Sequence, residues 1–382
     1  MFEPPIPYGH QWIDDDDIEA VARALRSDFL TTGPAVPAFE DDLRHETGAR
    51  YAVVLSSGTA ALHAAYAAIG VGPGAEVITS PLTFAATANA ALYLGAHPVF
   101  VDVEPDTGTI DEAAVEAAVT PRTKAIVAID FAGLPADYEA LNAVATRHGI
   151  RLVADAAHSL GATYNGRPVG GLADVSVLSF HPVKAITTGE GGAILTDDAA
   201  VADFARIFRT HGIVREPARL RRHDGPWHHE MQTLGFNYRL TDFQAALGSS
   251  QMRKLGRFIA RRREIAAFYD RSLSQVAGIS VPGRRAGSES AWHLYVVRVD
   301  DPSRRRPFFE ALRARGLGVQ LHYIPVHHHP LYADLGYPRD LCPRAVNYSA
   351  RAISIPMYPA LTDDQTARVA DIVASAAQDL LT

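Results

Sequence analysis

From Tyr51 onward, short apolar runs alternate with longer alanine-rich segments in which apolar residues recur at helical spacing. The helical pattern covers 59–69, 84–94, 112–119 and 138–148. The seven apolar runs read YAVVL, EVITS, HPVFVDV, KAIVAID, RLVADAA, DVSVLSF and GAILTDD. Nearly continuous Val, Ile and Ala strands separated by helices indicate a mostly parallel sheet that helices cover on both faces. The pattern therefore predicts a large α/β domain.

The ends of the chain follow other patterns. Near the N-terminus, the acidic run 14–17 is expected to cap a helix over 18–26 rather than to bind a metal, and a second helical pattern ends at Gly48. Beyond Trp292, the pattern reads strand (HLYVVRV), helix (306–315), strand (GVQLHYI), loop and final helix (363–380). This succession predicts a small C-terminal α+β domain.

Two segments connect these parts. Residues 211–236 are rich in His, Arg and Gly and are expected to form a loop, which is usually functional when it is this long. Residues 241–273 read as a long amphipathic helix with a break expected near Gly256. We therefore predict a large domain over 1–250 and a second domain, which begins with the linking helix, over 251–382.

Composition fits two domains and narrows the class of protein. The 382 residues are 47% hydrophobic, enough for a large core and too many for one ordinary domain. A net charge of -7 with scattered basic residues argues against nucleic acid as a partner. The single cysteine, Cys342, supports neither a disulfide framework nor a cysteine-based zinc site. Without a signal sequence or a run near the ~20 apolar residues of a membrane span, we expect a soluble cytoplasmic protein.

One lysine, Lys184, stands between two apolar runs in the segment VLSFHPVKAITTGEGGAIL. Removing an ammonium group from water costs on the order of several kcal/mol unless the group is paired or loses its proton. A lysine that loses its proton becomes a nucleophile and forms Schiff bases with carbonyls. From this segment alone two interpretations stand: a surface lysine on a glycine-rich hairpin, or a nucleophile.

Three other positions bear on that choice. The turn SSGTA (56–60) joins a strand to a helix, so it either caps the helix or offers backbone N–H groups to an anion. Asp155 ends the run RLVAD, where open α/β sheets place their ligands, and either caps the next turn or pairs with a cation, with His158 three residues on. Phe84 starts a helix, and its ring either stacks on a planar cofactor or joins the core.

Together these positions meet the needs of one cofactor. Pyridoxal phosphate requires a Schiff-base lysine, a phosphate site and a carboxylate on its ring nitrogen, so that the ring acts as an electron sink. The sequence supplies all of these near the ends of strands in one predicted sheet. We therefore expect pyridoxal 5'-phosphate as cofactor and no metal.

The sequence also resembles the fold-type I pyridoxal-phosphate enzymes, and closely the DegT/DnrJ/EryC1/StrS family of nucleotide-sugar aminotransferases. The resemblance implies a seven-stranded, mostly parallel sheet in the large domain. The matching motifs span almost the whole chain: SSGTAAL (56–62), SPLTFAATANA (80–90), PVFVDV (98–103), DAAHSLGA (155–162), SFHPVKAITTGEGG (179–192), RTHGI (209–213), GFNYRLTDFQAALG (235–248) and HYIPVHHHPLY (322–332).

Carried over residue by residue, the resemblance implies a complete site. Lys184 is implied as the Schiff-base lysine that also moves the proton, Asp155 as the partner of the ring nitrogen, and His158 as a contact of the ring near O3′. Phe84 occupies the ring-stacking position. The implied phosphate ligands are Ser57, Gly58, Thr59, Ala60 and Ser179, with Asn237 reaching in from the partner subunit of a homodimer. The implied substrate side comprises His181, Arg239, His322, Tyr323 and His327.

Within the family, SFHPVKAITTGEGG and DFAG (130–133) resemble enzymes of pseudaminic acid synthesis. That likeness implies ping-pong transfer of the amino group of L-glutamate to C4 of a UDP-linked 4-keto-6-deoxy-N-acetylhexosamine. Three alternatives stay open: a 3-keto-sugar aminotransferase, a cyclitol aminotransferase, or a non-catalytic pyridoxal-phosphate sensor. The related dehydratases have His in place of the lysine, so Lys184 disfavours them. The triple His327 to His329 favours a substrate loop or surface over a metal site.

Overall fold

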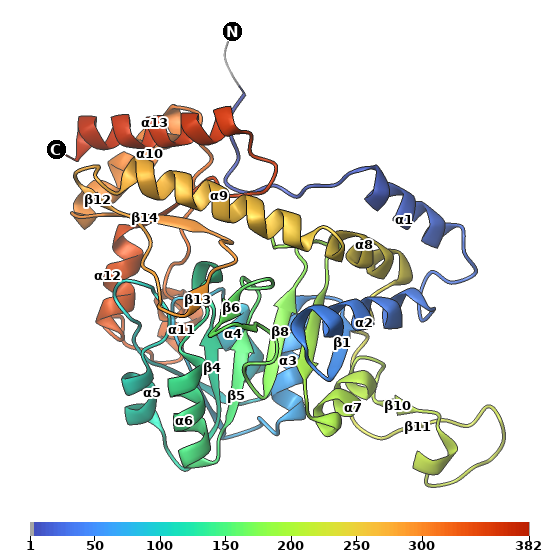
Figure 1. Ribbon diagram of the computed structural model, residues 1–382. Helices are drawn as coiled ribbons and strands as arrows, with labels where there is room; N and C mark the ends of the chain where they lie inside the picture. The colour runs from blue at the N-terminus through green and yellow to red at the C-terminus, as the bar shows by residue number, and fades with distance from the viewer. Residues whose placement is uncertain (1–3, 382) are drawn as a thin grey trace.

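The computed structural model describes residues 4–381, and its largest element is a seven-stranded sheet (Figure 1). Its strands, in spatial order, are β1 (Tyr51–Leu55), β9 (Gly192–Thr196), β8 (Val175–Ser179), β5 (Arg151–Asp155), β4 (Thr123–Ile129), β2 (Glu76–Thr79) and β3 (His97–Phe100). The neighbours from β8 to β3 pair in parallel, whereas β9 pairs antiparallel with both β1 and β8. The predicted α/β class and the mostly parallel sheet are confirmed.

Helices cover both faces of this sheet because its strands are apolar on both sides. Successive residues of β4, Ile126 and Val127, belong to two different hydrophobic cores, as the alternation of side chains along a strand requires. The first core packs against α2 (Ala35–Thr47), α5 (Glu112–Ala118), α6 (Tyr138–His148) and α8 (Asp242–Met252). The second packs against α3 (Gly58–Ala68), α4 (Ala86–Tyr93) and α7 (Ala199–Phe208).

The C-terminal part has its own sheet and core. The strands β12 (Ile279–Ser280), β14 (Tyr295–Val299) and β15 (Ala352–Ile355) form an antiparallel sheet. Its helices are α9 (Leu255–Leu273), α10 (Arg305–Ala314), α11 (Pro330–Asp334), α12 (Pro343–Arg351) and α13 (Asp363–Leu380). In Figure 1, α9 runs from α8 across the molecule and lies beside α13. The predicted boundary at residue 250 falls inside α8, and the division into domains stays a prediction.

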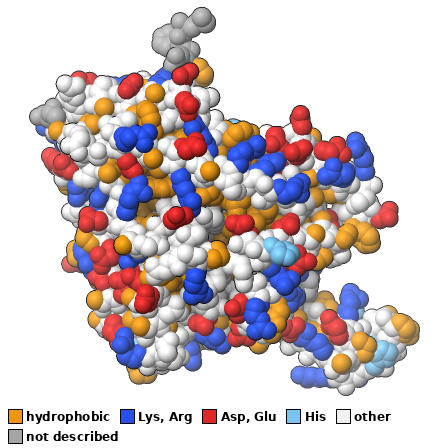
Figure 2. Space-filling model, viewed as in Figure 1, with side chains coloured by type: hydrophobic (Ala, Val, Ile, Leu, Met, Phe, Trp, Pro, Cys, Tyr) orange, Lys and Arg blue, Asp and Glu red, His pale blue; other side chains and the backbone are white. Residues whose placement is uncertain are grey.

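The remaining elements are short or lie at the periphery. Helix α1 (Asp15–Leu25) starts at Asp14, whose side chain and that of Asp17 form a capping box, as expected for the acidic run. The predicted loop 211–236 contains a hairpin that extends away from the body in Figures 1 and 2. The other small elements are β10 (Ile213–Val214), β11 (Glu230–Met231), β6 (Thr163–Tyr164), β7 (Arg167–Pro168), β13 (Ser288–Glu289), and the 3-10 turns η1 (Phe131–Gly133), η2 (Pro217–Arg219), η3 (Pro302–Arg304) and η4 (Val326–His328).

Of two predictions about the C-terminal half, one is wrong and one is confirmed. The run GVQLHYI is not a strand, because Gly318 N donates to Ile6 O whereas Gln320 pairs with Ser354, so neither partner continues into a ladder. The break expected near Gly256 in the helix over 241–273 is confirmed, because α8 ends at Met252 and α9 begins at Leu255. Within residues 4–381, every helix is too short or too polar to cross a membrane.

Candidate active site

A cavity of about 410 Å³ opens where β5 and β8 end. Open α/β sheets bind ligands at the carboxyl ends of their strands, so this position agrees with the architecture. Most of the predicted site residues line it. They are Ser57, Gly58, Thr59, Phe84, Asp155, His158, Ser179, His181, Lys184, His322 and Tyr323.

Lys184 sits in a closed loop between β8 and β9. Phe180 N donates to Gly191 O at 2.9 Å and Thr188 N donates to Phe180 O at 3.0 Å, which pins the two ends of the loop together. Burial lowers the pKa of the Lys184 amine to about 8, and the negative charge of Asp155 opposes this shift. A lowered pKa increases the fraction of neutral amine, which is the nucleophilic form.

Asp155 ends β5 with only 7% of its surface exposed. Its Oδ2 accepts a 2.7 Å hydrogen bond from Thr87 Oγ1, and its Oδ1 accepts a 3.3 Å bond from Ala157 N. Burial raises the pKa of Asp155, whereas the Thr87 bond and the Lys184 charge lower it. A buried carboxylate of this kind is stabilised by a cation or a protonated ring nitrogen placed in the cavity.

His158 is buried in a group of aromatic side chains. Its Nε2 and Tyr323 OH form a 3.1 Å hydrogen bond, and its ring centroid lies 4.2 Å from that of His293. Burial holds the pKa of both imidazoles well below the usual range, and the Lys184 charge lowers both further. Both rings are therefore neutral. His158 Nδ1 has no hydrogen-bond partner among residues 4–381, although it is buried.

The SSGTA turn both caps α3 and lines the cavity, as its two sequence interpretations allow. Ser57 Oγ caps α3 by accepting a 3.1 Å hydrogen bond from Ala60 N, whereas Gly58 and Thr59 line the cavity at the helix start. A Cβ on Gly58 would lie 3.0 Å from Ser179 Cβ, and a Cβ on Gly192 would lie 2.5 Å from Ser57 O. Glycine at both positions thus lets the turn approach β8 and β9 closely. The N–H groups of a first helical turn lack partners within the helix and suit an anion.

Four predicted residues do not line the cavity. Ala60 is buried behind the turn, Asn237 is exposed and bridges to Thr210, and Arg239 follows two residues later. His327 is only 1% exposed and its ring centroid lies 6.0 Å from that of Phe100. The structure therefore places His327 in the core beside α11, outside the wall that a substrate in this cavity would contact.

The cavity lining also contains residues that the sequence does not identify, among them Thr87, Tyr8 and His293. Thr87 lies three residues after Phe84, a spacing that places the two on one side of a helix, so the SPLTFAATANA motif contained a usable signal. Tyr8 and His293 come from distant parts of the chain and line the cavity through the tertiary fold. No local pattern marks either of them.

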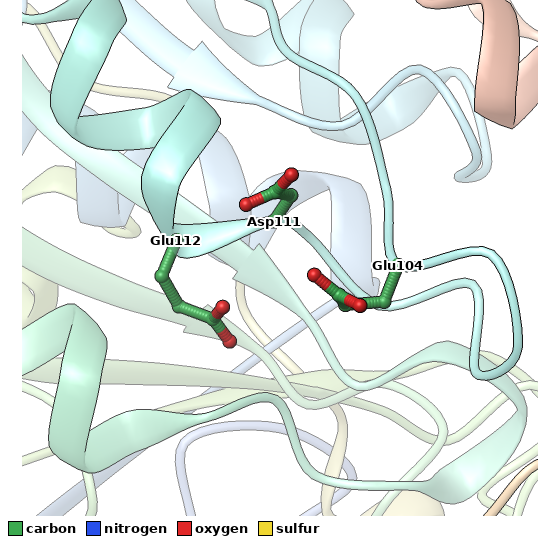
Figure 3. A group of neighbouring side chains, drawn as sticks. All are labelled: Glu104, Asp111 and Glu112. Carbon is green, nitrogen blue, oxygen red and sulfur yellow. The ribbon is translucent and has the colours of Figure 1, made fainter.

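A separate acidic group lies at the start of α5, where Glu104, Asp111 and Glu112 have ligand atoms within 4.8 Å of one another (Figure 3). Arg344 pairs with Asp111, and Arg285 Nη2 lies 3.7 Å from Glu112 Oε1. These arginines offset the negative charge that would attract a cation. We assign no metal to the group.

Comparisons with known proteins agree along nearly the whole chain. The sequence is 40% identical over 373 residues to the spore coat polysaccharide biosynthesis protein SpsC of Bacillus subtilis (strain 168), covering 96% of each chain. The fold is similar to that of Helicobacter pylori PseC, an aminotransferase involved in the biosynthesis of pseudoaminic acid (TM-score 0.93, 32% identity, 98% of this chain and 100% of that chain). It is also similar to Spr1654 of Streptococcus pneumoniae in its PLP form (TM-score 0.93, 30% identity, 99% and 100% covered).

The sequence model of one family matches most of the chain, from residue 11 to residue 374. The match contains the loop of Lys184 and the turn of Gly58, as well as α9 and the C-terminal sheet. The chain belongs to the DegT/DnrJ/EryC1/StrS aminotransferase family.

Proposed function

We propose that this protein transfers the amino group of L-glutamate to the C4 keto group of a UDP-linked 4-keto-6-deoxy-N-acetylhexosamine by a ping-pong mechanism. The observation that carries the proposal is the Lys184 amine, whose pKa burial lowers to about 8, in one cavity with Asp155. Family membership gives the reaction class. The likeness to PseC supports the choice of sugar.

Pyridoxal phosphate is the cofactor of this family, and the residues present fit it. The cavity offers an amine, a buried carboxylate and a close-packed glycine turn at a helix start. The unpartnered Nδ1 of buried His158 leaves a polar atom for a ligand. When bound, pyridoxal phosphate supplies an electron sink for the electron pair left on carbon after loss of a proton.

Each of these groups has a proposed role. Asp155 holds the ring nitrogen, with Thr87 fixing the orientation of its carboxylate. The N–H groups of Gly58 and Thr59, with Ser179 Oγ, hold the phosphate. Ser57 acts indirectly, because its Oγ is engaged with Ala60 N and maintains the helix start.

Lys184 performs the proton transfers. Its Nζ takes the α-proton of the amino donor and later delivers a proton to the carbon that accepts the amino group. A pKa near 8 suits both directions, because the amine gives up and takes up a proton near neutral pH. His158 and His322 stay neutral and act as hydrogen-bonding groups, since burial lowers the pKa of both.

Aromatic side chains form part of the cavity wall. Phe84 is 63% exposed, and its ring centroid lies 6.4 Å from that of Tyr323. Tyr8 faces His322 at a centroid distance of 5.7 Å. These rings present an apolar surface to the ring of a cofactor or sugar. His181 and Tyr323 complete the proposed substrate side.

A homodimer supplies the cations that the cavity lacks. Among the described residues that line the cavity, Lys184 is the sole Lys or Arg, whereas glutamate and UDP bring carboxylates and phosphates. Asn237 lies on an exposed segment that does not reach its own cavity, and Arg239 lies beside it. We place Asn237 of the partner subunit at the phosphate and Arg239 of the partner subunit at a substrate anion.

The test is to incubate the enzyme, pyridoxal phosphate and L-glutamate with matched UDP-linked 4-keto and 3-keto sugars, and to determine each product by NMR. We expect an amino group at C4 and formation of 2-oxoglutarate in equal amount. Amination at C3 alone would replace the C4 assignment. An enzyme that binds the cofactor but aminates neither set would refute the proposed activity.

A further inference from the structure

Asp130, which follows β4, has a fully buried carboxylate that joins two parts of the cavity wall. Its Oδ2 accepts a 2.5 Å hydrogen bond from Ser159 Oγ, and its Oδ1 accepts bonds from Tyr138 OH at 2.8 Å and Ala136 N at 2.9 Å. Ser159 directly follows His158. The carboxylate therefore anchors the turn that presents His158 to the cavity.

The backbone of the same segment strengthens this connection. Asp130 N donates to Asp155 O at 3.2 Å, so the segment also contacts the residue that ends β5. Ser159 N donates to Ala156 O at 3.0 Å and Ala162 N donates to Ser159 O at 2.8 Å, which makes the 155–162 turn a compact unit. A displacement of Ser159 would therefore move His158 with it.

The turn η1, which follows Asp130, contacts the second histidine. Gly133 has φ +98°, and a Cβ there would lie 2.8 Å from the backbone nitrogens of both Trp292 and His293, and 3.1 Å from His158 O. Ala291 N donates to Gly133 O at 3.0 Å, and Leu294 N donates to Ala132 O at 3.2 Å. The η1 turn thus lies between the segment that carries His158 and the segment that carries His293.

We propose that Asp130 is a positioning residue, which fixes the neighbouring rings of His158 and His293 against the cavity by holding Ser159 on one side and the η1 turn on the other. The inference rests on the proposed function only in that the cavity is taken to bind pyridoxal phosphate. Asp130 does not line the cavity, so it acts through the histidines and not on a ligand.

The charges around Asp130 give the proposal a pH signature. Burial is the largest effect and raises the pKa of Asp130 to about 7. Two titratable groups also act on it: the charge of Asp155 of β5 raises its pKa, whereas the hydrogen bond from Tyr138 of α6 lowers it. The hydrogen bond from Ser159 strengthens when the carboxylate ionises. The orientation of His158 therefore changes as Asp130 titrates, with the ionised form holding Ser159 more tightly.

The test uses the holoenzyme and the visible circular dichroism of bound pyridoxal phosphate, which reports how the ring is held. The variants are Ser159→Ala, Asp130→Ala and the conservative Asp130→Asn, which keeps an acceptor for Tyr138 and Ala136. Asp137→Asn is the matched control, because Asp137 lies in the same segment but accepts from Tyr164 OH at 2.7 Å and from Arg285 at 2.9 Å. Cofactor content and Tm are measured for every variant.

We expect the wild-type signal to change in a step near pH 7 that Asp130→Asn lacks. At equal cofactor content, Ser159→Ala and Asp130→Ala lower the ellipticity by about half and kcat about tenfold with little change in KM, since each variant removes a hydrogen bond to a charged group. The ellipticity and kcat of Asp130→Asn lie between those of the two alanine variants and those of wild type, and Asp137→Asn has wild-type values of both.

Variants with a lowered Tm but wild-type ellipticity, kcat and pH step would overturn the proposal, because Asp130 would then act on stability alone. The ellipticity is measured on the holoenzyme without substrate. If the wild type bound the cofactor but aminated no keto sugar, the proposed function would fail while the order of the ellipticities still decided the role of Asp130.

Discussion

Thr87 Oγ1 donates a 2.7 Å hydrogen bond to Asp155 Oδ2. Thr87 Oγ1 also lies 2.8 Å from Thr83 Oγ1. A side chain of α4 therefore orients the carboxylate at the end of β5 from within the buried interior. The bond also lowers the pKa of Asp155 against the effect of burial. Thr87 thus helps to keep Asp155 ionised, which its proposed role requires.

Thr87→Val keeps the shape of the side chain but removes this bond, and we expect kcat/KM to fall about tenfold to hundredfold. The pKa of Asp155 rises without the bond, so the acid limb of the pH profile of kcat/KM moves to higher pH. Steady-state kinetics across pH measure both effects. Thr83→Val is the control, because Thr83 contacts Thr87 but not Asp155. If Thr87→Val and Thr83→Val changed kcat/KM and its pH profile equally, the role of Thr87 in holding Asp155 would be contradicted.

Lys184→Met should stabilise the apoprotein at pH 7 by about 2 kcal/mol. The pKa of Lys184 is lowered from 10.5 to about 8 in the folded chain, so below pH 8 folding buries a charge. Between pH 8 and 10.5 the unfolded chain binds more protons than the folded chain, so wild-type stability rises with pH and the gain from methionine shrinks.

Urea unfolding of both apoproteins at pH 7 and at pH 10, at one protein concentration, tests this expectation. Lys124→Met provides the control, since Lys124 is exposed. A gain that stays constant between the two pH values would show that the titration of Lys184 is not its cause.

The sequence predicts helices and strands well where a local signal starts or ends them. The limits of α6 agree with prediction because Asp137 caps its start and Gly149, with φ +65°, ends it. The limits of α13 agree because Thr362 and Gln365 form a capping box. The sequence predicts a loop after Pro325, yet this region contains α12 and β15, which become stable only against the C-terminal core.

The same distinction between local signals and long-range contacts applies to the site residues. Lys184, Asp155 and Gly58 stand at strand ends, where short motifs reveal them. His293 enters the cavity because Gly133 lets two backbones approach, and Tyr8 enters because Met357 N donates to Tyr8 O at 3.0 Å. Such long-range contacts leave no local pattern. His327 resembled a substrate residue, but its side chain points into the core.

A buried ion pair joins α2 to the end of α7 and gives a stability prediction. Glu40 Oε1 accepts from Arg209 Nη1 at 2.6 Å and from Val54 N at 3.0 Å, with both side chains mostly buried. Arg209→Met leaves the Glu40 charge buried without its cation, so we expect a loss of about 3–5 kcal/mol of unfolding free energy.

The exposed pair Arg44 and Asp41 on the same helix provides the control for chemical denaturation. Arg44→Met should cost less than about 1 kcal/mol, because solvent screens the pair. Comparable losses in the two variants would show that burial does not set the strength of the Glu40 pair.

A mixing experiment tests whether two subunits share each site. Lys184→Ala and Asn237→Ala dimers are each expected to be nearly inactive. If Asn237 acts in the partner's cavity, a mixed dimer has one site with both lesions and one intact site, so random exchange restores about one quarter of wild-type activity. Lys184→Ala mixed with Asp155→Ala is the control, because both residues line one cavity and no intact site forms. Recovery in neither mixture would place Asn237 with its own subunit's cavity or outside the reaction, whereas recovery in the first alone requires that the partner complete the site.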